Sequence, residues 1–144
     1  MKVDLTEIRR GIAATLPFVL SHHEPTEWNR CYTLPFFGRR VRLCGRCSGI
    51  YPGIVFALLA PAHLGTLLAV AVLPLPALLD WTLTAFTRAD GYNVVRTVTG
   101  AALGIGYGFG LRRLFSQSDT RVLAIGIGYA LVAGLLLWRR ERAE

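Results

Sequence analysis

The sequence predicts an all-α integral membrane protein with about four transmembrane helices, an N-terminal amphipathic helix and a small Cys/His metal-binding loop or hairpin. Of its 144 residues, 53% are hydrophobic and 17% are charged, whereas soluble domains have roughly 25% charged residues. The mean hydropathy is +0.43. No charged side chain appears between Arg46 and Asp80, and a helix of that stretch would be about 50 Å long. Because a hydrocarbon core is only about 30 Å thick, the stretch is expected to fold back once, at residues 61–65.

The chain divides into three segments: an amphipathic interfacial helix over residues 1–21, a Cys/His metal-binding segment over 22–47, and a four-helix transmembrane bundle over 48–144. In the first segment apolar side chains recur at helical spacing, at Leu5, Ile8, Ile12 and Leu16. The helix is short for a span and carries Arg9 and Arg10 in its middle. It is therefore expected to lie in the headgroup region.

The second segment holds all three cysteines of the chain, spaced Cys31-x12-Cys44-x2-Cys47, with His22 and His23 just upstream. Zinc bound by three thiolates and one imidazole is a common structural site, and two ligands separated by two residues are its usual half. We therefore predict Zn²⁺ bound by the three cysteines and one histidine. The spacing leaves both histidines open, and His23 is favoured because it is nearer the proline turn that follows.

A hairpin with the ligands at its ends is the simplest structure for this segment. Residues 31–34 and 39–43 are the expected strands, because apolar and basic side chains alternate in the second of them. Two alternatives to metal remain open: a redox dithiol made of Cys44 and Cys47, and three unrelated cysteines. A structural disulfide is not expected if the segment faces the cytoplasm.

Four spans are predicted after the cysteines, at about residues 48–60, 66–86, 94–114 and 122–138. In the third span glycine recurs every four residues, at Gly100, Gly104 and Gly108. Small residues at this spacing let helices approach closely in lipid. Glycines of the last span are expected to supply the partner surface, namely Gly126, Gly128 and Gly134. The glycine-rich helices could also join a homo-oligomer or a membrane-protein partner.

The basic residues indicate orientation rather than nucleic-acid binding. Half of the 16 Lys and Arg residues precede Cys47, and cytoplasmic loops of membrane proteins accumulate such residues. Both termini are therefore predicted to be cytoplasmic, in a multi-pass protein of the cell membrane whose partner is the lipid bilayer. The basic residues do not form the continuous footprint of a nucleic-acid groove, so no nucleic-acid partner is expected.

Ionisable side chains are expected near the cysteines at one membrane face. Asp80 ends the second span and Arg96 begins the third, on the same side by alternation. A carboxylate in a span is costly and marks a function or a pairing. We expect an ion pair between Asp80 and Arg96, and a polar pocket that also includes Asn93 and Arg46.

The run Leu43-Cys44-Gly45-Arg46-Cys47-Ser48-Gly49-Ile50-Tyr51-Pro52-Gly53 resembles the signature P-x-C-x-R-C-x-G-I-Y-x-G of a prokaryotic family of small membrane proteins, domain of unknown function 2085. Later positions resemble the same family, at Pro76, Asp80, Asn93, Arg96 and Gly100. The resemblance covers roughly residues 22–104 and implies a membrane protein without an established activity. His22 stands where that family has a cysteine, which bears on the number of thiolates at the metal.

The sequence favours a small polytopic membrane protein with a structural zinc site on its cytoplasmic face, a binding or accessory role and no enzymatic activity. Four protein ligands leave no open position on the metal for chemistry. The alternatives are a transporter or metal-handling protein and a membrane-embedded metal-dependent enzyme that uses Asp80 and Arg96. If only three ligands bind, Asp80 or Glu24 could act as a base for a zinc-bound water.

Overall fold

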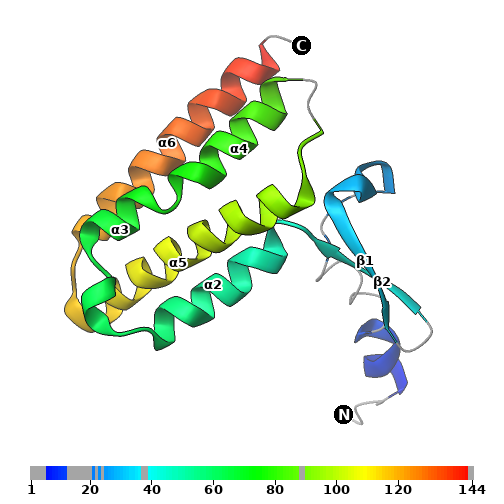
Figure 1. The fold of residues 1–144 in the computed structure, drawn as a ribbon, viewed down its shortest axis with the longest axis horizontal. Coiled ribbons are helices and arrows are strands. Elements are labelled where there is room, and N and C mark those ends of the chain that lie inside the picture. Colours follow the sequence, from blue (N-terminus) through cyan, green and yellow to red (C-terminus); the bar gives the residue numbers. More distant parts are fainter. Residues whose placement is uncertain are drawn as a thin grey trace.

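The computed structural model describes residues 6–12, 21, 23, 25–36, 39–87 and 90–142. The named elements are η1 (Pro25–Arg30), β1 (Cys31–Phe36), β2 (Arg39–Cys44), α2 (Cys47–Leu59), η2 (Ala62–Leu64), α3 (Leu67–Val72), α4 (Leu75–Phe86), α5 (Asn93–Gln117) and α6 (Arg121–Glu141). A two-stranded hairpin projects from one end of a helical bundle (Figure 1). The prediction of a mostly helical chain is therefore confirmed.

The predicted N-terminal helix falls only partly within the described residues. Residues 6–12 are helical and exposed. The other residues of the predicted 1–21 segment, apart from Ser21, lie outside the described part of the chain.

Three helical stretches of the described chain are long and apolar enough to cross a membrane: Leu67–Phe86, Asn93–Gln117 and Arg121–Glu141. They correspond to the last three of the four predicted spans. The first predicted span is α2, which has 13 residues and is therefore about 20 Å long, against a hydrocarbon core of about 30 Å. The described residues thus contain three candidate spans and one shorter apolar helix.

The span predicted over residues 66–86 is made of two helices. The Thr66 side chain caps α3 by accepting a hydrogen bond from the backbone N–H of Ala69 at 3.1 Å. The second helix, α4, starts directly after Pro74. Proline has no N–H to donate and its ring clashes with the preceding turn, so it ends one helix and is tolerated at the start of the next.

The hairpin forms where the sequence predicts it and is slightly longer. Its strands are antiparallel, and Cys31 lies opposite Cys44 in the register. Pro35 lies within β1, which is possible because both strands of a two-stranded sheet are edge strands. The backbone N–H of Gly45 donates to the carbonyl of Arg30 at 3.0 Å. This bond closes the base of the hairpin just before α2 begins.

The helices α2 and α5 lie side by side along a seam of small residues (Figure 1). A Cβ atom added to Gly49 would lie 2.0 Å from the carbonyl oxygen of Thr97, and one added to Gly104 would lie 2.2 Å from that of Ile50. The two rows of small residues that meet are Gly49, Gly53 and Ala57 on α2 and Gly100, Gly104 and Gly108 on α5. Each row repeats every four residues, so it stays on one helix face.

The prediction that glycines of the last span face the glycine row of α5 is wrong. A Cβ atom added to Gly126, Gly128 or Gly134 would meet nothing within 4 Å. These glycines are two and six residues apart, so they point to different sides of the helix. The partner is α2, whose small residues share the spacing of those on α5.

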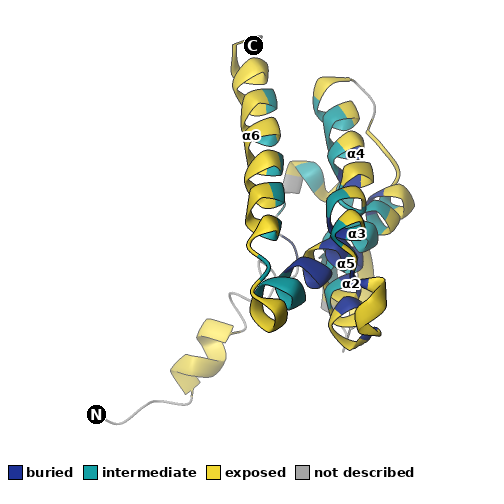
Figure 2. Cartoon of the chain, turned by 90° about the vertical axis from the view of Figure 1, so that its left-hand side faces the viewer, coloured by how far each residue is buried: buried dark blue, intermediate teal, exposed yellow. Residues whose placement is uncertain are grey.

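The last helix is only loosely joined to the rest of the bundle. None of its residues is buried, and Figure 2 shows α6 standing apart from α3, α4 and α5. Its first turns contact a small core of Ala57, Ala60, Val70 and Phe109 through Val122 and Ile125. Farther along, the Tyr129 hydroxyl donates to the carbonyl of Ala71 on α3.

Candidate metal centre and polar cluster

The three cysteines gather where the hairpin meets α2. Cys31 and Cys44 are opposed at the base of the hairpin, and Cys47 is the first residue of α2. Cys44 is 2% exposed and Cys31 is 7% exposed. All three are free thiols. Cys44 is the central member, because it hydrogen-bonds the Cys47 thiol and lies opposite Cys31 in the hairpin.

His23 lies against this group and is oriented by a carboxylate. Its Nε2 is 3.3 Å from the Cys44 sulfur, and its Nδ1 is 3.0 Å from Oε2 of Glu27. Glu27 also pairs with Arg30 at 2.8 Å. A hydrogen-bonded carboxylate fixes the tautomer and the orientation of an imidazole. The ring is thus held with Nε2 toward the cysteines.

The thiols lie in a poorly solvated environment. The pKa of the Cys47 thiol is raised to about 11, mainly by burial and to a smaller extent by the neighbouring Cys44. The positive charge of Arg46 acts in the opposite direction. The Cys31 sulfur is 3.2 Å from the hydroxyl of Ser21. Cys47 is consequently protonated at neutral pH in this arrangement of side chains.

In the part of the chain that the structure describes, no group of three or more His, Cys, Asp or Glu side chains could hold a metal ion. The zinc site therefore stays a prediction. Of its candidate ligands, His23 and the three cysteines are described, whereas His22 lies outside the described residues, as does Glu24.

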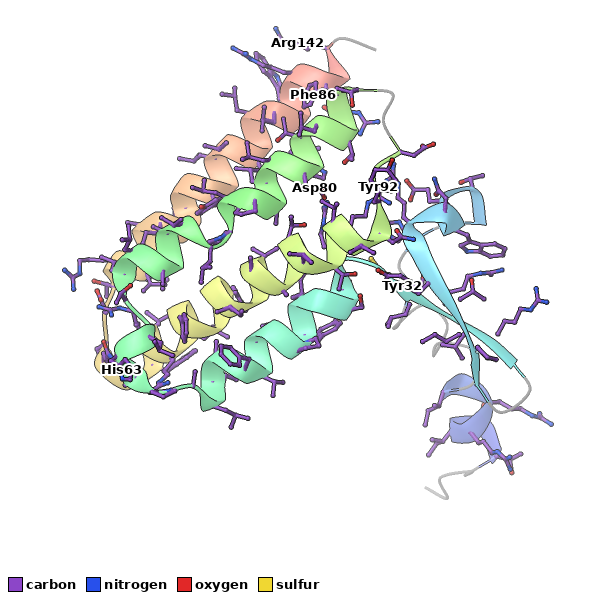
Figure 3. All side chains as sticks on the ribbon, in the orientation of Figure 1. Tyr32, His63, Asp80, Phe86, Tyr92 and Arg142 are labelled. Atoms are coloured by element: carbon purple, nitrogen blue, oxygen red, sulfur yellow. The ribbon has the colours of Figure 1, made fainter. Side chains whose placement is uncertain are left out.

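The loop between Cys44 and Cys47 is anchored on the start of α5. The Thr97 hydroxyl donates to the carbonyl of Gly45 at 2.8 Å and lies 3.0 Å from the hydroxyl of Tyr32 on β1. The side-chain amide of Asn93 donates to the carbonyl of Asn29 at 2.9 Å. Figure 3 shows Tyr32 beside the first turns of α5. The helix α5 thus supports both the hairpin and the cysteine loop.

Thr97 is the residue that sequence reasoning missed. It lies one helical turn after Asn93, on the same face of α5. That spacing is the only signal for it in the sequence, since threonine is common in membrane helices.

The Asp80 carboxylate pairs with a different arginine from the one predicted. It forms an ion pair with Arg46, whose side chain is 24% exposed against 8% for Asp80. The pair links the start of α2 to α4, and Figure 3 shows Asp80 between α4 and α5. The buried Arg96 instead donates to the carbonyl of Asp90 and to Oδ1 of Asn93, the latter at 3.3 Å. Arg46 reaches Asp80 because it directly precedes α2, whose seam with α5 brings it alongside α4.

A second cluster of ions lies near η2, at the end of the helices where Figure 3 labels His63, because Arg113 bonds the residue that follows η2. Arg113 pairs with Asp119 at 2.7 Å and Arg121 with Asp119 at 2.8 Å. Hydrogen bonds from Arg121 and then Arg113 hold the pKa of the Asp119 carboxyl well below its usual range. Arg113 also donates to the carbonyl of Gly65 at 2.8 Å, and Arg112 to that of Ala60. Arg112 and Arg113 thus tie α5 to the turn between α2 and α3.

The family model described as predicted membrane protein (DUF2085) matches residues 28–109, which is more than half of the chain. The chain belongs to this family. The DUF2085 match includes the three cysteines, the Arg46–Asp80 pair and the first turns of α5, and it ends before α6. His23 precedes the matched range. No curated protein and no solved structure gives a significant match.

Proposed function

We propose that His23, Cys31, Cys44 and Cys47 bind a structural Zn²⁺ that holds the hairpin on the end of the α2–α5 pair, in a membrane protein with a binding or accessory role. The observation that carries the proposal is the position of the His23 imidazole. It lies between the Glu27 carboxylate at 3.0 Å and the Cys44 sulfur at 3.3 Å.

This position resembles the arrangement of zinc-binding histidines in general. A ligand histidine almost always donates its other ring N–H to a carboxylate or carbonyl, and Glu27 fills that place for His23. Three thiolates and one imidazole form a common closed zinc site. In a filled site of this kind the cysteine sulfurs would lie about 2.3 Å from the ion.

The role of the ion would be mechanical. It would join the segment before β1, the base of the hairpin and the first residue of α2, which are separated in sequence but contact the same Cys44. Because four protein ligands complete a tetrahedral shell, no position remains for a substrate. The ion pair of Asp80 with Arg46 also argues against Asp80 as a general base.

We further propose that α2 lies in the membrane as a fourth apolar helix that reaches only part of the way across. Its close packing on α5 supports this placement. The backbone carbonyls of α2 and α5 that face each other at the seam are surrounded by apolar helices. The hairpin end and both termini would then face the cytoplasm, as the excess of basic residues before Cys47 indicates.

The test is the zinc content per chain of the detergent-purified protein, measured by elemental mass spectrometry. We expect about one zinc per chain for the parent and for His22→Ala, and a loss of zinc in His23→Ala and Cys44→Ser. The two histidine variants are a matched pair, because only one of the adjacent rings is proposed to bind. A parent protein without zinc would contradict the proposal.

Glu27→Gln tests the orienting role of the carboxylate separately. It removes no ligand, so the site should still fill at high zinc, but the affinity should fall by about 10- to 100-fold. Competition with a chromogenic chelator measures this change. An unchanged affinity would mean that Glu27 does not orient a ligand. Zinc that exchanges rapidly and crosses liposome membranes would instead favour the metal-handling alternative.

A further inference from the structure

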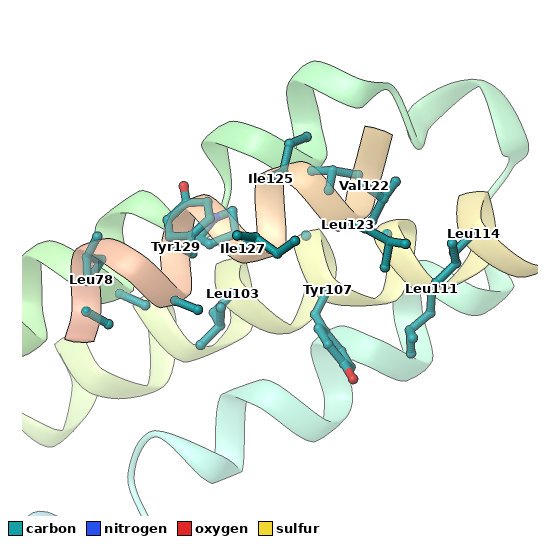
Figure 4. A pocket seen from close by; sticks show the side chains of 18 of the residues that line it. Leu78, Leu103, Tyr107, Leu111, Leu114, Val122, Leu123, Ile125, Ile127 and Tyr129 are labelled. Atoms are coloured by element: carbon teal, nitrogen blue, oxygen red, sulfur yellow. The ribbon is translucent and has the colours of Figure 1, made fainter. Parts of the chain in front are cut away.

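An apolar cavity of about 870 Å³ lies between the loosely packed α6 and the helices α4 and α5 (Figure 4). Its walls are almost entirely aliphatic and aromatic, and the side chains of Leu78, Leu103 and Ile125 are among them. Gly126 also lines it, and a Cβ atom there would meet nothing within 4 Å. All three helices belong to candidate spans, so the cavity lies at the depth of the bilayer.

One end of the cavity carries positive charge. Arg46 is the only charged residue among the described residues that line it. Its Nε is buried without a hydrogen-bond partner. The Nη2 of Arg46 pairs with Asp80, so the buried Nε–H is the donor left for an anionic group.

The charged end lies near the edge of the membrane. The backbone of Arg46 packs against Gly100 of α5, which is about 10 Å along the helix from its first residue. The lining of α6 extends from Val122 to Leu137, a distance of about 22 Å. One leaflet of hydrocarbon is about 15 Å thick, so the cavity is long enough for a lipid acyl chain.

We propose that this cavity binds one anionic phospholipid of the bilayer, with an acyl chain between α6 and the α4–α5 pair and the phosphate at Arg46. An apolar cavity without polar partners does not hold water well. Acyl chains are the apolar material available at that depth. Basic pockets between membrane helices are known to take acidic headgroups.

The test compares binding of phosphatidylglycerol and phosphatidylcholine with identical acyl chains to the full-length protein in detergent, by native mass spectrometry. The parent should bind phosphatidylglycerol about tenfold more tightly, the effect of one charge-assisted hydrogen bond. Ala130→Phe fills the cavity and should weaken binding of both lipids. Ala124→Phe is the matched control, since both alanines are exposed on α6 but only Ala130 lines the cavity.

Arg46→Gln should abolish the preference for phosphatidylglycerol while phosphatidylcholine still binds. If that variant does not accumulate, the two alanine variants still decide the matter, because neither alters the ion pair. Equal binding of both lipids by the parent, or equal effects of the two alanine variants, would overturn the proposal. So would a cavity-filling variant that changes the oligomeric state, which would assign the cavity to a second copy. None of these measurements depends on zinc.

Discussion

The glycines of α5 pack closely against neighbouring residues, whereas those of α6 do not. On α5, Gly104 lies so close to α2 that a single Cβ atom would come within 2.2 Å of a backbone oxygen. On α6, a Cβ atom at Gly128 would meet nothing within 4 Å. A glycine therefore produces close packing only when the facing helix has small residues in the same register. Counting glycines in a span does not identify its partner.

The largest expected effect comes from adding a methyl group between α2 and α5. Gly104→Ala places a methyl group against the backbone of Ile50, which cannot rotate away, and we expect a loss of about 3 kcal/mol in the free energy of unfolding. Gly128→Ala should instead stabilise α6 by up to about 1 kcal/mol, because alanine favours helix more than glycine does. Unfolding midpoints in detergent measure both. Two variants with effects of the same sign would refute the contrast.

A smaller effect is expected at the link between the seam and the second span. Asp80→Asn leaves the partly exposed Arg46 without its counter-ion, and we expect a loss of about 2 kcal/mol. Hydrogen exchange should increase at the start of α2 and in α4 but not in α6. Asp90→Asn is the control, since Asp90 is an exposed carboxylate of the neighbouring loop. A uniform increase along all helices would show that Asp80 does not act as a local link.

The smallest effect concerns the turn between α5 and α6, which contains Asp119. Arg113 and Arg121 lower the pKa of Asp119 in the folded protein, so the stabilisation is present above the unfolded pKa of about 3.9 and is lost as the pH falls below it. Asp119→Asn should therefore lower the unfolding midpoint at pH 7, and the difference from the parent should shrink below about pH 4. A difference that stays constant between pH 7 and pH 3 would contradict this linkage.

Local features of the fold could be predicted because local chemistry determines them. The apolar runs and their flanking charges identify the helices to within a few residues, and the alternation of Arg42 with apolar neighbours identifies β2. The break at Pro74 was missed, although the proline that causes it is visible in the sequence. A hydropathy profile records only that the stretch is apolar, and both helices have that property.

Features that depend on two distant segments could not be predicted in the same way. The choice of Arg46 rather than Arg96 as the partner of Asp80 follows from the seam, which places the start of α2 beside α4. Thr97 supports a loop that lies 52 residues earlier in the chain. The spacing of the cysteines predicts that their side chains lie close together, and the structure places them together at the base of the hairpin. Binding of zinc by these cysteines stays a prediction.

The same contact between Thr97 and Gly45 sets an order of assembly during synthesis. The cysteine loop cannot dock until the start of α5 has been made, 52 residues later. At 5–20 residues per second this is an interval of about 3–10 s. Throughout that time the hairpin and its three thiols are present without the helix that supports them. During that interval the three thiols are open to oxidants and to competing metal ions.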